Sequence, residues 1–164
     1  MQPPRIVDRP AFRLMGIAAR TSNALEMDPA TAKIPGLWER FSFESLPGHI
    51  PYQPTPGIIY GLYSDFDGGA DGAYTLLVGC EVKAGAKAPG TLVARDVPGA
   101  RYAVFTSPRG PMPDIVINAW SEIWAMTARQ LGGERAFSGD FELYDERAVH
   151  TKDAEIEIWI SLKA

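Results

Sequence analysis

The sequence predicts an α+β fold in which one antiparallel sheet is built from two strand-helix-strand-strand modules related by a pseudo-twofold axis. Glycine and proline, 16 and 14 of the 164 residues, divide the chain into short segments of the length that strands have. Two longer segments have apolar residues at helical spacing. The third observation is that both halves of the chain repeat the same order of elements.

The first module is expected to span residues 1–88, within a single domain that covers the whole chain. Its helix carries Leu37, Trp38 and Phe41 and ends at Pro47. A polar, glycine-rich turn joins the last two strands into a hairpin. The predicted strands are 12–20, 58–65 and 74–82.

The second module is expected to span residues 89–164 and to begin with an additional strand. Its helix begins at Pro113 and ends before Gly132, with one apolar face that includes Trp120. In the closing strand, isoleucine and leucine alternate with mostly polar residues, as in a strand with one buried face. The predicted strands are 90–95, 101–107, 141–144 and 156–162.

The two halves correspond at a spacing of about 80 to 90 residues, which suggests an internal duplication. The strand at 12–20 matches 101–109, and Val78 matches Ile160. A chance similarity between two α+β segments is the alternative. A true duplication is expected to leave a central ligand cleft along the axis between the modules.

The charge balance argues against direct binding of nucleic acid. There are 16 Lys and Arg residues and 20 Asp and Glu residues, whereas a nucleic-acid-binding face needs clustered basic residues. The lone Cys80 cannot form an internal disulfide, and His49 and His150 lack the spacing of a zinc site. No phosphate-binding or dinucleotide-binding glycine motif is present, so we expect no metal and no cofactor.

No stretch of the sequence reaches the roughly 18 consecutive apolar residues that a membrane span requires. The N-terminus lacks the cationic and apolar regions of an export signal. We therefore expect a cytoplasmic protein that contacts no membrane.

The segment around Glu142 is the main candidate for a binding site. Side chains alternate along a strand, so Glu142 and Tyr144 are expected to share one face of the sheet. Phe141 and Leu143 are expected to pack under the helices. This assignment leaves the other face to Glu142, Tyr144 and Trp159.

Gly61 matches Glu142 in the first module, and its missing side chain leaves space for a ligand across the axis. A carboxylate in an apolar surround loses solvation, and a cationic ligand would offset that loss. Aromatic faces would add roughly 0.5–2 kcal/mol each through cation–π contacts. The candidate aromatic residues are Tyr63, Tyr144, Trp159, Trp120 and Trp124.

A structural interpretation of the same residues stays open. Glu142 is also compatible with a surface position at a strand edge, paired with Arg135 or Lys163. Trp120 and Trp124 lie four residues apart on the predicted helix, which is the spacing of aromatic residues that pack together in a core.

Four segments of the chain carry a family resemblance through their order and spacing. They are 34–41 (IPGLWERF), 59–66 (IYGLYSDF), 74–82 (YTLLVGCEV) and 140–144 (DFELY). Together they resemble the gyrase-inhibitor-like (GyrI-like) small-molecule-binding superfamily, also met as the effector-binding domain of AraC-type and MerR-type multidrug regulators. The resemblance spans nearly the whole chain and implies a ligand held between two modules.

The resemblance implies that Glu142 is the acidic residue that meets lipophilic cations, and it adds Trp38 to the aromatic residues around it. It also implies a stand-alone effector-binding or drug-sensing protein linked to transcription regulation, because no helix-turn-helix segment accompanies the domain. A separate DNA-binding regulator would then be its partner.

Two alternative functions stay open at this point. Some members of the superfamily resemble hydrolases of electrophilic cyclopropane-bearing compounds, in which case Glu142 would be the general base and Tyr144 or Tyr63 its partner. Other members resemble inhibitors of gyrase, in which case a protein surface would be the ligand.

Overall fold

The computed structural model describes residues 1–164 and contains one eight-stranded antiparallel sheet, so the predicted α+β class is confirmed. The strands are β1 (Arg5–Arg9), β2 (Phe12–Ser22), β3 (Ile59–Ser64), β4 (Ala73–Val82), β5 (Val93–Val97), β6 (Ala100–Thr106), β7 (Asp140–Tyr144) and β8 (Glu157–Leu162). The helices are α1 (Asn23–Glu26), α2 (Ile34–Phe43), α3 (Asp114–Trp124) and α4 (Ala128–Leu131), with 3-10 turns η1 (Leu46–His49), η2 (Gly69–Asp71) and η3 (Glu146–Ala148). None of these helices has the length and apolar character needed to cross a membrane.

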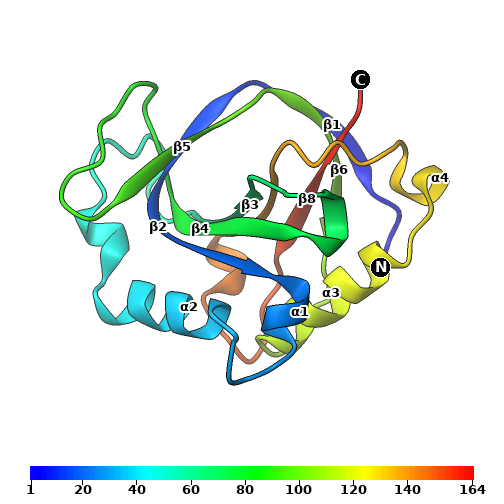
Figure 1. Cartoon of the computed structure of the whole chain (residues 1–164), viewed down its shortest axis with the longest axis horizontal. Coiled ribbons are helices and arrows are strands. Elements are labelled where there is room, and N and C mark those ends of the chain that lie inside the picture. Colours follow the sequence, from blue (N-terminus) through cyan, green and yellow to red (C-terminus); the bar gives the residue numbers. More distant parts are fainter.

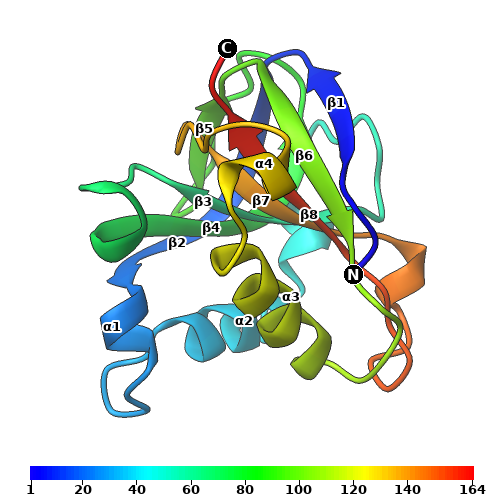
Figure 2. The ribbon, with the colours of Figure 1, turned by 90° about the vertical axis from the view of Figure 1, so that its right-hand side faces the viewer.

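The order of the strands, β1-β6-β8-β7-β3-β4-β2-β5, is symmetric about the boundary between β7 and β3. Each half contributes a strand, a helix and two further strands: β2-α2-β3-β4 and β6-α3-β7-β8. Both α2 and α3 lie on the same side of the sheet (Figure 1 and Figure 2). Gly61 pairs with Glu142 in the middle of the β3–β7 ladder, so these two residues lie on the pseudo-twofold axis.

The outermost strands are exchanged between the modules. β1 precedes β2 in the chain but pairs with β6, while β5 precedes β6 but pairs with β2. Both edge strands lie on the far side of the sheet from α2 and α3 (Figure 2). Pro10 and Pro98 follow β1 and β5, where a residue without an N–H ends each ladder. The module boundary at residues 88 and 89 stays a prediction.

The pairing register differs from the correspondence expected from the sequence. Val78 pairs with Gly61, and Ile158 pairs with Glu142, so Val78 corresponds to Ile158 and not to Ile160. This two-residue shift keeps the same face, because side chains alternate. The match of 12–20 with 101–109 is wrong by one residue, because the loops differ in length between the modules and apolar spacing alone does not set the register.

Hydrophobic clusters cover both faces of the sheet. The cluster under α3 contains Ile158, and the cluster under α2 contains Val78. A third cluster on the opposite face contains Phe141 and Leu143, so the prediction that these two residues pack under the helices is wrong. The side chain of Glu142 takes the helix-facing side instead, since it is paired with Ile158.

The single helix predicted between Pro113 and Gly132 is interrupted. α3 ends at Trp124, and α4 begins after Thr127. The Thr127 hydroxyl accepts from the backbone N–H of Gln130, and the Gln130 side chain accepts from the backbone N–H of Thr127. This capping box favours a new helix start at that point.

Two glycines, Gly16 in β2 and Gly79 in β4, allow close approach of the paired strands. A Cβ atom at Gly16 would lie 1.9 Å from the backbone oxygen of Val78, and one at Gly79 would lie 2.1 Å from that of Met15. We expect Gly79→Ala to lower the free energy of unfolding by about 1–3 kcal/mol or more, because the backbone has to move. Urea unfolding measures this difference.

Gly36 in α2 supplies the control, because no atom lies within 4 Å of a Cβ added there. Gly36→Ala is expected to leave the free energy of unfolding unchanged or to raise it by up to about 1 kcal/mol. Equal stability of the Gly79→Ala and Gly36→Ala variants would contradict the steric argument.

Candidate functional site

The carboxylate of Glu142 lies on the pseudo-twofold axis, between the sheet and the two long helices. Glu142 is 1% exposed and lies in the middle of the short strand β7. Its neighbours along β7 point to the opposite face of the sheet. Burial on this face therefore follows from the alternation of β7 and from the pairing of Glu142 with Ile158.

Three neutral side chains donate hydrogen bonds to this carboxylate. The hydroxyl of Tyr63 in β3 and the indole N–H of Trp120 in α3 donate to Oε1 at 2.9 and 2.7 Å. The hydroxyl of Tyr144 in β7 donates to Oε2 at 2.5 Å. The carboxylate is thus held from the sheet and from α3, but no donor carries a positive charge.

Gly61 and Trp38 complete the surround of the carboxylate. A Cβ atom at Gly61 would lie 3.0 Å from Oε2 of Glu142 and 3.4 Å from the Trp38 ring, so the absence of a side chain leaves room for both groups. Trp38 in α2 packs edge-on against Tyr144, with ring centres 5.1 Å apart. Hereafter Trp38, Tyr63, Trp120 and Tyr144 are called the axial cage.

Burial raises the pKa of the Glu142 carboxyl, and the hydrogen bonds from Tyr144, Trp120 and Tyr63 offset part of this rise. Burial and the neighbouring carboxylate also raise the pKa of Tyr63 and of Tyr144 well above the usual range. Both hydroxyls therefore remain protonated and available as donors at neutral pH.

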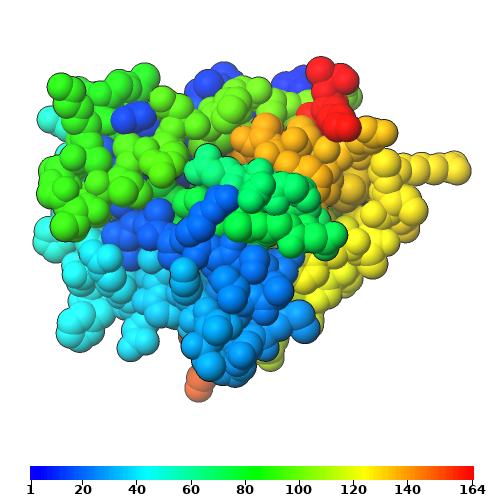
Figure 3. All heavy atoms as spheres, in the orientation of Figure 1, coloured from blue at the N-terminus to red at the C-terminus, as the bar shows by residue number.

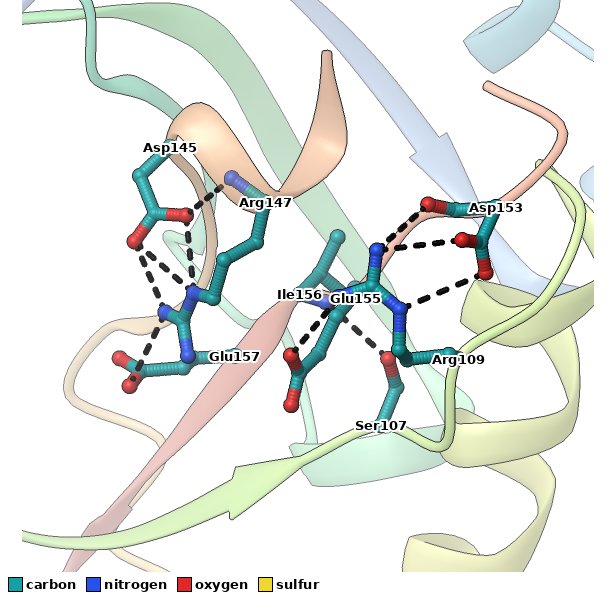
Figure 4. A network of polar contacts seen from close by, with 8 residues as sticks. All are labelled: Ser107, Arg109, Asp145, Arg147, Asp153, Glu155, Ile156 and Glu157. Carbon is teal, nitrogen blue, oxygen red and sulfur yellow. Dashed lines mark hydrogen bonds and ion pairs between the residues drawn. The ribbon is translucent and has the colours of Figure 1, made fainter. Parts of the chain in front are cut away.

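Glu142 is the one buried carboxylate in the protein with no basic side chain against it. Asp140 is fully buried and contacts the guanidinium of Arg135 at 2.7 Å. Glu157 contacts Arg147 at 3.2 Å, within the network of ion pairs at the start of β8 (Figure 4). The other buried acids thus have basic partners inside the chain, while Glu142 has none.

The alternative in which Glu142 is a surface carboxylate paired with Arg135 or Lys163 is wrong. Arg135 pairs with Asp140, which lies two residues earlier on the same strand. Lys163 pairs with Glu134 at the surface, 2.9 Å away.

The axial cage lies where the central cleft is expected, around the carboxylate of Glu142. The rings of Tyr63 and Trp120 lie 5.2 Å apart and close the side that faces α3. Two surface hollows lie elsewhere, one lined by Phe12 and the other lined by Phe41. On the face seen in Figure 3, the atoms of α1 and α3 adjoin below the sheet without an opening between them.

Two of the predicted site residues lie outside this cluster. Trp159 pairs with Phe141 and stacks on its ring at 5.2 Å, so it lies on the face of the sheet away from Glu142. Trp124 is 53% exposed at the end of α3 and contacts Trp120 with ring centres 6.1 Å apart.

Tyr74 is a residue near the site that sequence reasoning missed. Its ring packs edge-on against Tyr63 at 5.4 Å, and its hydroxyl donates to the side chain of Asn23. Side chains alternate along β4, and Tyr74 and Val78 are separated by an even number of residues. The sequence therefore indicated that Tyr74 points to the same face of the sheet as Val78.

A site of this kind suits an uncharged or cationic organic ligand, since it offers aromatic faces and one carboxylate. No group of three or more His, Cys, Asp or Glu side chains lies close enough together to hold a metal ion. Residues 2–163 match the family of the GyrI-like small molecule binding domain, and the chain belongs to this family. The resemblance seen in the sequence is confirmed.

Two relatives and one solved structure place the chain more closely. YobU of Bacillus subtilis (strain 168) is 36% identical over 151 residues, which cover 92% of this chain and 92% of YobU. The transcriptional regulator BrlR of Pseudomonas aeruginosa is 32% identical over 143 residues, which cover 87% of this chain and 48% of BrlR. The chain therefore corresponds to about half the length of BrlR.

The solved structure is SAV2435 bound to tetraphenylphosphonium. It has a TM-score of 0.77 at 18% sequence identity, with 99% of this chain and 95% of that chain covered. This likeness shows that the fold is shared. The protein is thus a small-molecule-binding domain with a relative among transcriptional regulators.

The raised pKa of Glu142 predicts a pH dependence of stability. The folded protein binds more protons than the unfolded chain between the ordinary glutamate pKa and the raised folded-state pKa. The stability contributed by Glu142 is therefore present below this window and falls as the pH rises through it. We expect the free energy of unfolding of the wild type, minus that of Glu142→Gln, to fall over the same window in urea titrations.

Glu39→Gln is the matched control, because Glu39 is exposed on α2 and lies outside the axial cage. Its difference from the wild type is expected to stay flat over that window. A flat difference for Glu142→Gln as well would refute the burial argument.

Proposed function

We propose that the protein binds lipophilic, aromatic cations at Glu142, inside the axial cage. The observation that supports this proposal best is that the Glu142 carboxyl is buried with no basic side chain against it. The structure of SAV2435 bound to tetraphenylphosphonium, a protein of the same fold, lends further support to a ligand of this class.

The free energy of binding would come from two sources. A buried carboxylate has lost the solvation of water, and neutral donors replace only part of it, so a cation placed beside Glu142 stabilises the charged form. The ring faces of Trp38 and Trp120 would each add roughly 0.5–2 kcal/mol through cation–π contacts. Because Glu142 is 1% exposed, the ligand has to displace cage side chains in order to reach it.

The biological role that fits this binding is ligand sensing for transcription regulation in the cytoplasm. BrlR, about twice the length of the matched region, is named a transcriptional regulator. We infer that this chain reports ligand binding to a separate DNA-binding regulator. Neither the family nor the relatives favour the hydrolase alternative, so we do not assign Glu142 the role of a general base.

Glu142→Gln tests the proposal directly, because the amide removes the charge and keeps the shape. We expect the Kd of tetraphenylphosphonium to rise by about tenfold or more, corresponding to at least ~1.4 kcal/mol. Triphenylphosphine oxide, which is aromatic and neutral, is expected to bind the variant as well as it binds the wild type. Isothermal titration calorimetry measures both constants.

Glu39→Gln again serves as the control and is expected to bind both compounds as the wild type does. If Glu142→Gln weakens the two compounds equally, or leaves both unchanged, the charge of Glu142 has no part in ligand binding.

A pair of tryptophan variants tests the contribution of α3. Trp120→Phe keeps an aromatic ring but removes the N–H that donates to Glu142. Without this donor the pKa of Glu142 is expected to rise further, so that less of the carboxyl is charged, and binding of tetraphenylphosphonium is expected to weaken by about 2- to 10-fold. Trp124→Phe, one helical turn further along, is expected to bind as the wild type does. Equal Kd values for the two variants would argue against a role for the Trp120 donor.

A further inference from the structure

A second aromatic surround lies on the face of the sheet away from the helices, and it holds the side chain of Arg9. The guanidinium carbon of Arg9 lies 3.8 Å from the centre of the Phe12 ring. The ring centres of Phe141, Trp159 and Tyr60 follow at 5.3, 5.4 and 5.5 Å. Hereafter these four rings are called the rear box.

An acidic partner for the guanidinium lies beside the rear box. Nη2 of Arg9 donates to Oε1 of Glu81 at 3.1 Å and to the hydroxyl of Tyr60 at 3.0 Å. The Tyr60 hydroxyl in turn donates to the same oxygen of Glu81 at 3.3 Å. The guanidinium thus lies close over the Phe12 ring and donates from one nitrogen to a carboxylate, and a flat cation can approach a ring face this closely.

The rear box lies next to the solvent. Arg9 is the last residue of β1, and its side chain is 17% exposed. A surface hollow of about 240 Å³ is lined by Phe12 and Glu81, which also contact Arg9. A small molecule therefore has a short path to the box once the Arg9 side chain is removed.

The contacts of Arg9 connect the two modules. β1 pairs with β6 of the second module. The rings of Phe141 and Trp159 also come from the second module, from β7 and β8. Tyr60 and Glu81, which accept from Arg9, belong to β3 and β4 of the first module. The contacts of Arg9 in the rear box therefore stabilise the pairing of β1 with the second module and also offset the charge of Glu81.

We propose that the rear box is a second cation site, selective for planar guanidinium-type cations, which Arg9 occupies as an intramolecular ligand. An external guanidinium compound binds there only where the Arg9 side chain is absent. In the wild type the box is closed to external cations. The proposal is independent of the function proposed for Glu142, because the two sites lie on opposite faces of the sheet.

Chemical rescue of Arg9→Ala tests this inference. We expect the variant to have a Tm several degrees below that of the wild type. Ethylguanidinium at millimolar concentration is expected to raise this Tm toward the wild-type value, because a ligand that binds only the folded state stabilises it. Ethylammonium, which has the same charge without the planar group, is expected to raise the Tm less.

Four controls make the result specific. The wild type and Arg101→Ala, which removes an exposed arginine of β6, are expected to show no rise of Tm with ethylguanidinium. The double variant Arg9→Ala/Phe12→Leu is expected to lose the rescue. Adding Glu142→Gln to Arg9→Ala is expected to leave the rescue unchanged, so this test can fail or succeed separately from the binding test at Glu142.

If Arg9→Ala does not fold alone, recovery of folded protein on refolding with ethylguanidinium is the readout, and Arg9→Gln provides a milder variant. No rescue, an equal effect of the two cations, or an equal rise of Tm in the wild type would overturn the proposal.

Discussion

One buried carboxylate, held by neutral donors, connects α3 with the two central strands β3 and β7. Glu142 lies on the pseudo-twofold axis, where a charged group is costly because water is excluded and no basic side chain compensates it. Two tyrosine hydroxyls and one indole N–H satisfy its oxygens without removing its charge. These donors bring β3, β7 and α3 together around the same two atoms.

Each face of the sheet has a charged side chain among aromatic rings, and the two faces differ in whether the chain also supplies the opposite charge. On the face away from the helices, Arg9 lies among aromatic rings and contacts Glu81, so that the positive and the negative group are both supplied by the chain. On the helix face, the rings surround a carboxylate without a cation. This contrast separates a charged pair supplied entirely by the chain from a buried carboxylate that has no basic side chain against it.

Several features of the site could be predicted from particular residues. The alternation in residues 140–144 placed Glu142 and Tyr144 on a common face, and the repeated order of elements placed Gly61 opposite Glu142. The face itself could not be predicted, because both sides of this sheet are covered: the helices cover one, and the exchanged strands β1 and β5 lie over the other. A covered sheet has apolar residues on both faces, so the usual contrast between a buried and a wet face is absent.

The sequence by itself determined the fold class, the repeated modules and the short list of residues that contains Glu142, because strand and helix periods and turn residues are local properties. Tertiary structure decided the pairing register, which placed Trp159 beside Phe141 on the face of the sheet away from the helices. It also decided the rotation of α3 about its axis, which turned Trp120 toward Glu142 and left Trp124 exposed. It also decided which acids have basic partners. These outcomes depend on contacts between residues far apart in the chain, and local spacing does not specify such contacts.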